Sequence, residues 1–134
     1  MRIAIIGGGA AGLAAAVAAA RKLGERGLHE AAGVVVFEAD ERVGRSILAT
    51  GNGRCNFSNS SVDASLYRNP EFVADALRAL ADDGAARLKA RGLACDPGED
   101  PVLRFFEDLG LAWREEGEGR LYPATGKAST VVDV

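Results

Sequence analysis

The chain contains few of the residues that carry metal, thiol or imidazole chemistry. It has two cysteines and one histidine in 134 residues. Cys55 and Cys95 are too far apart to form a Cys-x-x-Cys redox pair or half of a zinc site, and His29 has no second histidine to share a metal with it. The sequence therefore predicts neither a dithiol centre nor a metal site. It also carries no sign of an oxidising compartment, so we expect a cytoplasmic protein.

The chain also lacks a large excess of charge of either sign. Sixteen Lys and Arg residues stand against nineteen Asp and Glu residues, for a formal net charge of −3. This balance gives no indication that nucleic acid is the main partner. The length is sufficient for one domain with a core, and no repeat or low-complexity linker divides it. We therefore expect a single domain over residues 1–134.

A dense glycine turn stands near the start of the chain. Residues 2–6 predict an apolar strand, Gly7 to Gly12 a tight turn, and the alanine-rich stretch that follows a helix. In such a turn Gly7 makes the bend, Gly9 lets the backbone approach a pyrophosphate, and Gly12 lets the helix pack closely on the strand. The N–H groups at the helix start favour a phosphate. The pattern is typical of the start of a dinucleotide-binding βαβ unit.

Two other interpretations fit the same segment. A basic residue, an apolar run and the small residues at 18–20 outline a signal peptide. The uncharged residues 3–20 are also about long enough to span a membrane. Three consecutive glycines at 7–9 break the helix that either segment requires. We therefore favour the nucleotide-binding turn and expect no membrane partner.

A second buried strand is predicted over residues 33–37, which are rich in β-branched side chains and end at Glu38. An acid at this position is placed to accept hydrogen bonds from the hydroxyls of a ribose. Glu38 lies 26 residues after Gly12, somewhat further than the usual separation of about twenty. A surface loop around His29 accounts for the extra length.

The remainder of the chain predicts helices and a hairpin but no third parallel strand. We expect an ordered loop over 39–62 and then a helix from Asn69 to about Leu88, which Gly84 weakens. A short helix follows from Pro101 and is ended by Gly110. We then expect a β-hairpin from 111–115 and 119–123, and a last helix that is capped by Thr125 or Ser129 and continues to Val134. A doubly wound sheet needs at least a third parallel strand. We therefore expect the N-terminal part of a longer protein, with an incomplete parallel sheet.

A second group of functional residue types lies in the segment 44–56. Glycines on both sides of Asn52 allow unusual backbone torsions and expose N–H groups. Arg45 and Arg54 supply guanidinium groups suited to phosphate or carboxylate. From composition alone, a glycine-rich surface turn with an incidental buried Cys55 explains the segment equally well.

These motifs resemble a family of bacterial flavoproteins. The stretch Thr50-Gly51-Asn52-Gly53-Arg54-Cys55-Asn56, together with the opening glycines, Glu38 and Gly44-Arg45, is similar to BaiN-like, or aminoacetone-oxidase-type, NAD(P)/FAD-dependent oxidoreductases. The segments 105–110, 119–123 and 127–128 match the same pattern. The resemblance covers most of the chain and implies an α/β fold, the N-terminal part of a Rossmann-like FAD-binding domain.

The resemblance implies FAD as the cofactor, and it leaves NAD(P)H open as an electron donor of the longer protein. It implies that Glu38 holds the adenosine ribose and that the pyrophosphate is lined by Gly7, Gly9, Ala10, Ala11 and Gly12. It also implies that Gly44 and Arg45 approach the pyrophosphate and ribityl region. The residues that it implies near the isoalloxazine ring are Gly51, Asn52, Gly53, Arg54, Cys55 and Asn56. Cys55 is interpreted as a packed small residue. Ser46 stands where relatives often carry a lysine, and no residue is assigned as catalytic.

The chain departs from this family in length. The segment of about 81–101 is longer than in relatives, whereas the whole chain is much shorter and lacks the inserted substrate domain and the C-terminal segment that completes the FAD site. We therefore expect residues 1–134 to form a truncated FAD-binding domain that is inactive alone, with an unidentified small-molecule substrate. Two alternatives stay open: an NAD(P)-binding Rossmann domain, and a non-catalytic fragment or homo-oligomer without tightly bound cofactor.

Overall fold

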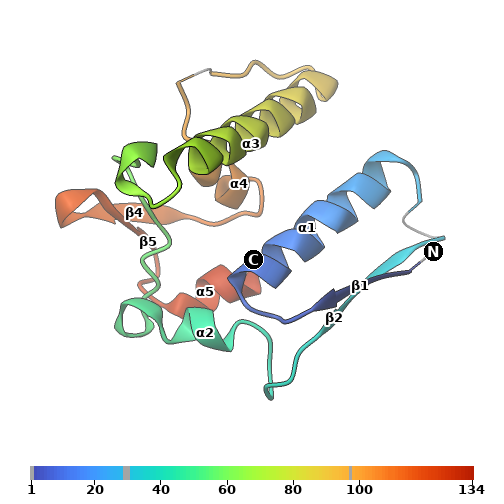
Figure 1. Ribbon diagram of the computed structural model, residues 1–134, viewed down its shortest axis with the longest axis horizontal. Coiled ribbons are helices and arrows are strands. Elements are labelled where there is room, and N and C mark those ends of the chain that lie inside the picture. The colour runs from blue at the N-terminus through green and yellow to red at the C-terminus, as the bar shows by residue number, and fades with distance from the viewer. Residues whose placement is uncertain (1, 29–30, 97) are drawn as a thin grey trace. The chain divides into compact units, whose positions relative to one another are not determined.

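The computed structural model describes residues 2–28, 31–96 and 98–134 (Figure 1). The chain divides into two compact units. Unit 1 consists of Met1–Cys55 and Lys127–Asp133, and unit 2 of Asn56–Gly126 and Val134. His29, which the sequence assigns to a surface loop, lies outside the described residues.

Unit 1 begins with the predicted strand, turn, helix and strand. The strands β1 (Arg2–Ile6) and β2 (Gly33–Phe37) pair in parallel, with Ile5 opposite Val36, and α1 (Ala10–Glu25) connects them. Ile5 points toward α1, because its Cγ2 lies 3.5 Å from the Cβ position of Gly12. Within the described part of the chain, no helix is both long enough and apolar enough to cross a membrane.

The opposite face of this sheet exposes large apolar side chains. Ile6 is 82% exposed, Phe37 56% and Val35 43%. Both faces of a doubly wound sheet are normally covered. The described residues thus contain the incomplete parallel sheet that the sequence predicts.

Short helices complete unit 1, in part where the sequence predicts a loop. They are α2 (Arg45–Leu48), the 3₁₀ turn η1 (Thr50–Gly53) and α5 (Ala128–Asp133). α5 packs against α2, because a Cβ at Gly44 would lie 2.7 Å from both γ-carbons of Val132. The predicted start of α5 at Thr125 or Ser129 is wrong. Gly126, with a φ of +67°, closes a turn onto Pro123, and the helix begins only after it.

Unit 2 contains a three-stranded antiparallel sheet in the order β3-β5-β4. The predicted hairpin is confirmed as β4 (Trp113–Glu116) and β5 (Arg120–Pro123), joined by the 3₁₀ turn η3 (Gly117–Gly119). The added strand β3 (Ser58–Asn59) was not predicted. Leu121 of β5 is fully buried, and an edge-to-face contact of Phe57 with Phe106, 4.8 Å between ring centroids, extends this core.

The helices of unit 2 are α3 (Pro70–Ala90) and α4 (Pro101–Glu107), preceded by the 3₁₀ turn η2 (Ala64–Leu66). The sequence predicts that Gly84 weakens this helix, but α3 runs through Gly84 without a break. Gly84 is buried inside the continuous helix, and a Cβ there would lie 3.8 Å from the Cγ of Arg104, an ordinary van der Waals distance to α4. α4 ends at Glu107, before the predicted stop, and a turn leads to Gly110 with a φ of +91°.

The two predicted helix starts differ in how they are capped. Asp100 caps α4 through hydrogen bonds from the N–H groups of Val102 and Leu103. Asn69 makes no side-chain hydrogen bond at the start of α3. Arg87 of α3 donates to Asp108 over 2.8 Å, and both side chains are largely buried. This pair fastens α3 to the residue that follows α4.

Candidate functional site

The glycine turn has the backbone geometry that the sequence predicts. Gly7 has a φ of +94°, where only glycine is free of strain, and its N–H donates to Phe37 O over 2.8 Å. A Cβ at Gly12 would lie 1.8 Å from Gly7 O. The bend at Gly7 and the close approach at Gly12 are therefore both present.

Gly9 differs from these two glycines because no close contact with the protein demands it. Its φ of −77° suits any residue, and a Cβ there would meet only Ser46 Oγ, at 3.4 Å. The first-turn N–H groups of an α-helix have no acceptor within the helix, and α1 has no side-chain cap. The space beside Gly9, which a Cβ would partly fill, adjoins these N–H groups. It therefore fits an anionic ligand that contacts the backbone.

Gly8, for which the sequence predicts no separate role, joins the turn to the loop after β2. Its N–H donates to Glu38 Oε2 over 2.6 Å, and its carbonyl accepts from the N–H of Gly44 over 2.7 Å. A Cβ at Gly8 would lie 2.7 Å from Val43 Cγ1. The run of three glycines was the available signal in the sequence. The middle glycine is required because a side chain there would collide with Val43.

Glu38 is the centre of a small hydrogen-bond network. Besides Gly8, the N–H groups of Ala39 and Asp40 donate to Oε1, over 2.6 and 2.9 Å. The backbone N–H groups of Asp40, Gly8 and Ala39 hold the pKa of Glu38 below its ordinary value of 4.5. A carboxylate accepts about four hydrogen bonds in all, so one acceptor position remains for a ribose hydroxyl. Glu38 thus anchors the turn through its hydrogen bonds to the backbone.

The two side chains that follow Gly44 have different surroundings. Arg45, predicted to approach the pyrophosphate, donates from Nη1 to Asp40 Oδ1 over 2.6 Å, and both side chains are exposed. Ser46 is instead the residue whose side chain lies beside Gly9. Gly44, with a φ of +72°, allows the backbone to turn into α2.

The segment from Gly51 to Cys55 is held in an unusual backbone conformation. Left-handed φ values occur at Gly51 (54°), Asn52 (54°), Gly53 (81°) and Cys55 (56°). Outside glycine such values cost about 1–3 kcal/mol and gather at functional sites. Cys55 is 5% exposed, and its thiol is unpaired, which agrees with its predicted role as a packed small residue.

The structure brings most of the predicted residues into unit 1 but places Asn56 in unit 2. The Asn56 carboxamide, with its nitrogen turned toward them, donates to the carbonyls of Ser58 and Leu121 over 2.7 and 3.1 Å. It thereby fixes the start of the unit 2 sheet. Among the residues that the structure describes, no group of three His, Cys, Asp or Glu side chains is placed to hold a metal ion.

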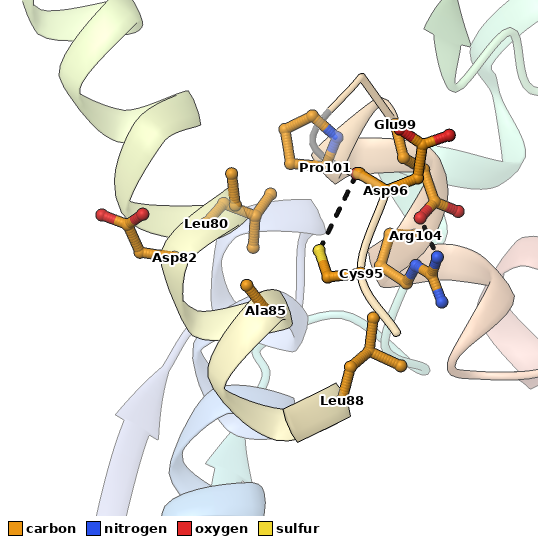
Figure 2. A pocket seen from close by; sticks show the side chains of 11 residues that line it. Leu80, Asp82, Ala85, Leu88, Cys95, Asp96, Glu99, Pro101 and Arg104 are labelled. Carbon is orange, nitrogen blue, oxygen red and sulfur yellow. Dashed lines mark hydrogen bonds and ion pairs between the residues drawn. The ribbon is translucent and has the colours of Figure 1, made fainter. Parts of the chain in front are cut away.

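A separate cavity of about 440 Å³ lies in unit 2 between α3 and the segment that leads into α4. Figure 2 shows Leu80 and Leu88 on one side and Pro101 on the other, with Cys95 between them. Arg104 forms an ion pair with Glu99 at the wall. The segment of about 81–101 supplies most of this lining. None of the predicted cofactor-binding residues lines the cavity.

Comparison with known proteins identifies relatives along the whole chain. A family model described as "HI0933-like protein Rossmann domain" matches residues 1–134. The chain is 39% identical over 135 residues to the 3-dehydro-bile acid delta(4,6)-reductase of Clostridium scindens, which covers 99% of this chain and 27% of the relative.

Two further relatives carry the name ribosomal RNA dihydrouridine synthase. The Haemophilus influenzae protein is 45% identical over 116 residues, covering 77% of this chain and 27% of the relative. The Escherichia coli protein is 33% identical over 132 residues, covering 97% and 26%. The chain therefore spans about a quarter of the length of the curated relatives that it matches.

Proposed function

This chain belongs to the HI0933-like family of Rossmann domains, and on that premise we propose that it binds the ADP part of FAD within a flavin-dependent oxidoreductase. The membership confirms the predicted fold class and the resemblance at the level of the family. The observation that carries the proposal is the open position at Gly9. No packing contact requires a glycine there, yet the position adjoins the N–H groups of the first turn of α1.

We assign the residues of unit 1 to parts of the dinucleotide. The turn from Gly7 to Gly12 holds the pyrophosphate through backbone N–H groups, and Glu38 accepts from the ribose at its remaining acceptor position. The segment 51–55 lies near the flavin ring. Bound FAD supplies hydride and electron transfer, and the protein supplies binding, orientation and electrostatics. The names of the relatives describe different substrates, so we carry none over to this chain.

The proposal is tested by titrating the purified protein with FAD and following flavin fluorescence. We expect saturable binding, and a decrease in affinity of about tenfold or more, or 1.4 kcal/mol, for Gly9→Val. The matched control is Gly33→Val. A Cβ at Gly33 has open space around it, and the residue starts a β-strand, where valine is favoured. Equal FAD affinity in Gly9→Val and the wild type would contradict the placement of the pyrophosphate.

The same titration separates the alternatives. Tighter binding of NAD(H) than of FAD would indicate a nicotinamide-binding Rossmann domain. Absence of binding to either dinucleotide, together with elution as a dimer or larger species, would support a folded oligomer without cofactor. The exposed Ile6, Val35 and Phe37 face favours this third interpretation.

A further inference from the structure

Apart from its chain neighbours, the side chain nearest to the Cβ position of Gly9 belongs to Ser46, which is not among the predicted cofactor-binding residues. Ser46 Oγ lies 3.4 Å from the Cβ position of Gly9. Apart from Gly9 and its chain neighbours, no other heavy atom comes within 4 Å of that point in the described structure. The Ser46 side chain is exposed on α2, and within the described ranges its hydroxyl forms no hydrogen bond. A hydroxyl donor is therefore available beside the start of α1.

The position of Ser46 is fixed by its surroundings. Two residues earlier, the N–H of Gly44 donates to Gly8 O over 2.7 Å, which ties the start of α2 to the glycine turn. Val132 of α5 packs against Gly44 from the other side. Arg45, the adjacent cation, is already engaged with Asp40. Of the two side chains, the structure thus places the neutral donor, and not the guanidinium, next to Gly9.

We propose that Ser46 is a cofactor-contacting residue, whose hydroxyl donates a hydrogen bond to a pyrophosphate oxygen of the bound dinucleotide. This inference rests on the proposed binding of FAD. A hydrogen bond from a hydroxyl to a charged phosphate oxygen is short and stronger than one between neutral groups. Because serine carries no charge, this contact adds directionality without the salt sensitivity of a lysine.

The central experiment compares Ser46→Ala with Ser61→Ala, an exposed serine of unit 2, by calorimetric titration with FAD, ADP and, through competition, adenosine. Circular dichroism confirms that both variants are folded. We expect Ser46→Ala to bind FAD and ADP about tenfold more weakly, as for a lost hydrogen bond to a charged group. Adenosine affinity stays the same because adenosine has no phosphate. Ser61→Ala leaves all three affinities unchanged.

A second variant, Ser46→Lys, tests the same placement by charge. We expect its ADP affinity to exceed that of the wild type at low salt by about two- to fivefold, and to fall more steeply as salt is added. A salt dependence equal to that of the wild type would place residue 46 away from the phosphates.

The outcomes distinguish this inference from the function on which it rests. A wild-type protein that binds neither FAD nor ADP would overturn both. A wild-type protein that binds both, with Ser46→Ala equal to it in ADP affinity, would overturn only the role of Ser46. Equal weakening of ADP and adenosine in Ser46→Ala would also overturn it, because the effect would then lie outside the phosphates.

Discussion

Two glycines of α1 predict opposite effects for the same substitution. A Cβ at Gly12 would lie 1.8 Å from the backbone oxygen of Gly7, whereas a Cβ at Gly24 has no heavy atom within 4 Å. Both residues lie inside the helix. Gly12→Ala therefore tests the contact between helix and turn, and Gly24→Ala measures the gain in helix propensity alone.

The magnitudes follow from these distances. Carbon–oxygen contacts of this kind do not occur below 3.0 Å, so α1 and the Gly7 carbonyl must separate by roughly 1.2 Å in Gly12→Ala. No rotation of a side chain can relieve a contact with backbone. We expect a cost of about 3 kcal/mol, offset by at most about 1 kcal/mol of propensity. Gly24→Ala should stabilise the fold by about 0.5 kcal/mol.

Urea denaturation followed by circular dichroism measures both changes. With a slope of about 2 kcal/mol per molar, Gly12→Ala should lower the midpoint by about 1 M and Gly24→Ala should raise it by about 0.25 M. Hydrogen exchange in peptides of α1 assigns the effect to unit 1. If Gly12→Ala unfolded at or above the wild-type midpoint, the close approach of α1 to Gly7 would be refuted.

Three further predictions concern acid stability and the core. Because the pKa of Glu38 is lowered in the folded protein, the ionised carboxylate stabilises the fold fully above the ordinary pKa of 4.5. This contribution is lost as the pH falls through the folded-state pKa. In Glu38→Gln, the melting temperature should therefore depend less on pH in this range. Leu121→Ala should destabilise the protein by about 3 kcal/mol in urea denaturation, because the side chain is fully buried. Arg87→Ala should cost about 2 kcal/mol by the same measurement and speed hydrogen exchange in α4, since Asp108 loses its charged partner.

The sequence was sufficient for elements whose signals are local. The apolar runs of β1 and β2, the glycines between β1 and α1, and the hairpin around Gly117 each depend on neighbouring residues. These elements appear where they were predicted. The geometric roles of Gly7 and Gly12 also follow from short spacing, because they belong to one turn.

Contacts between distant residues were not predictable in this way. The strand β3 exists because Ser58 and Asn59 pair with β5, about sixty residues later, and no local pattern encodes that pairing. The role of Gly8 depends on Glu38 and Val43, which fold back on it. Likewise, the pairing of Arg45 with Asp40 leaves the place beside Gly9 to Ser46, although the cation was the stronger signal in the sequence.

The division of unit 1 between the two ends of the chain has a consequence for folding during synthesis. All but one residue of unit 2 lies within the continuous stretch Asn56–Gly126, so nearly all of its chain emerges from the ribosome before Val132 does. The support that Val132 gives to Gly44 arrives only afterwards. Because domains fold as units during translation, α2 lacks its packing partner α5 while the intervening unit is made.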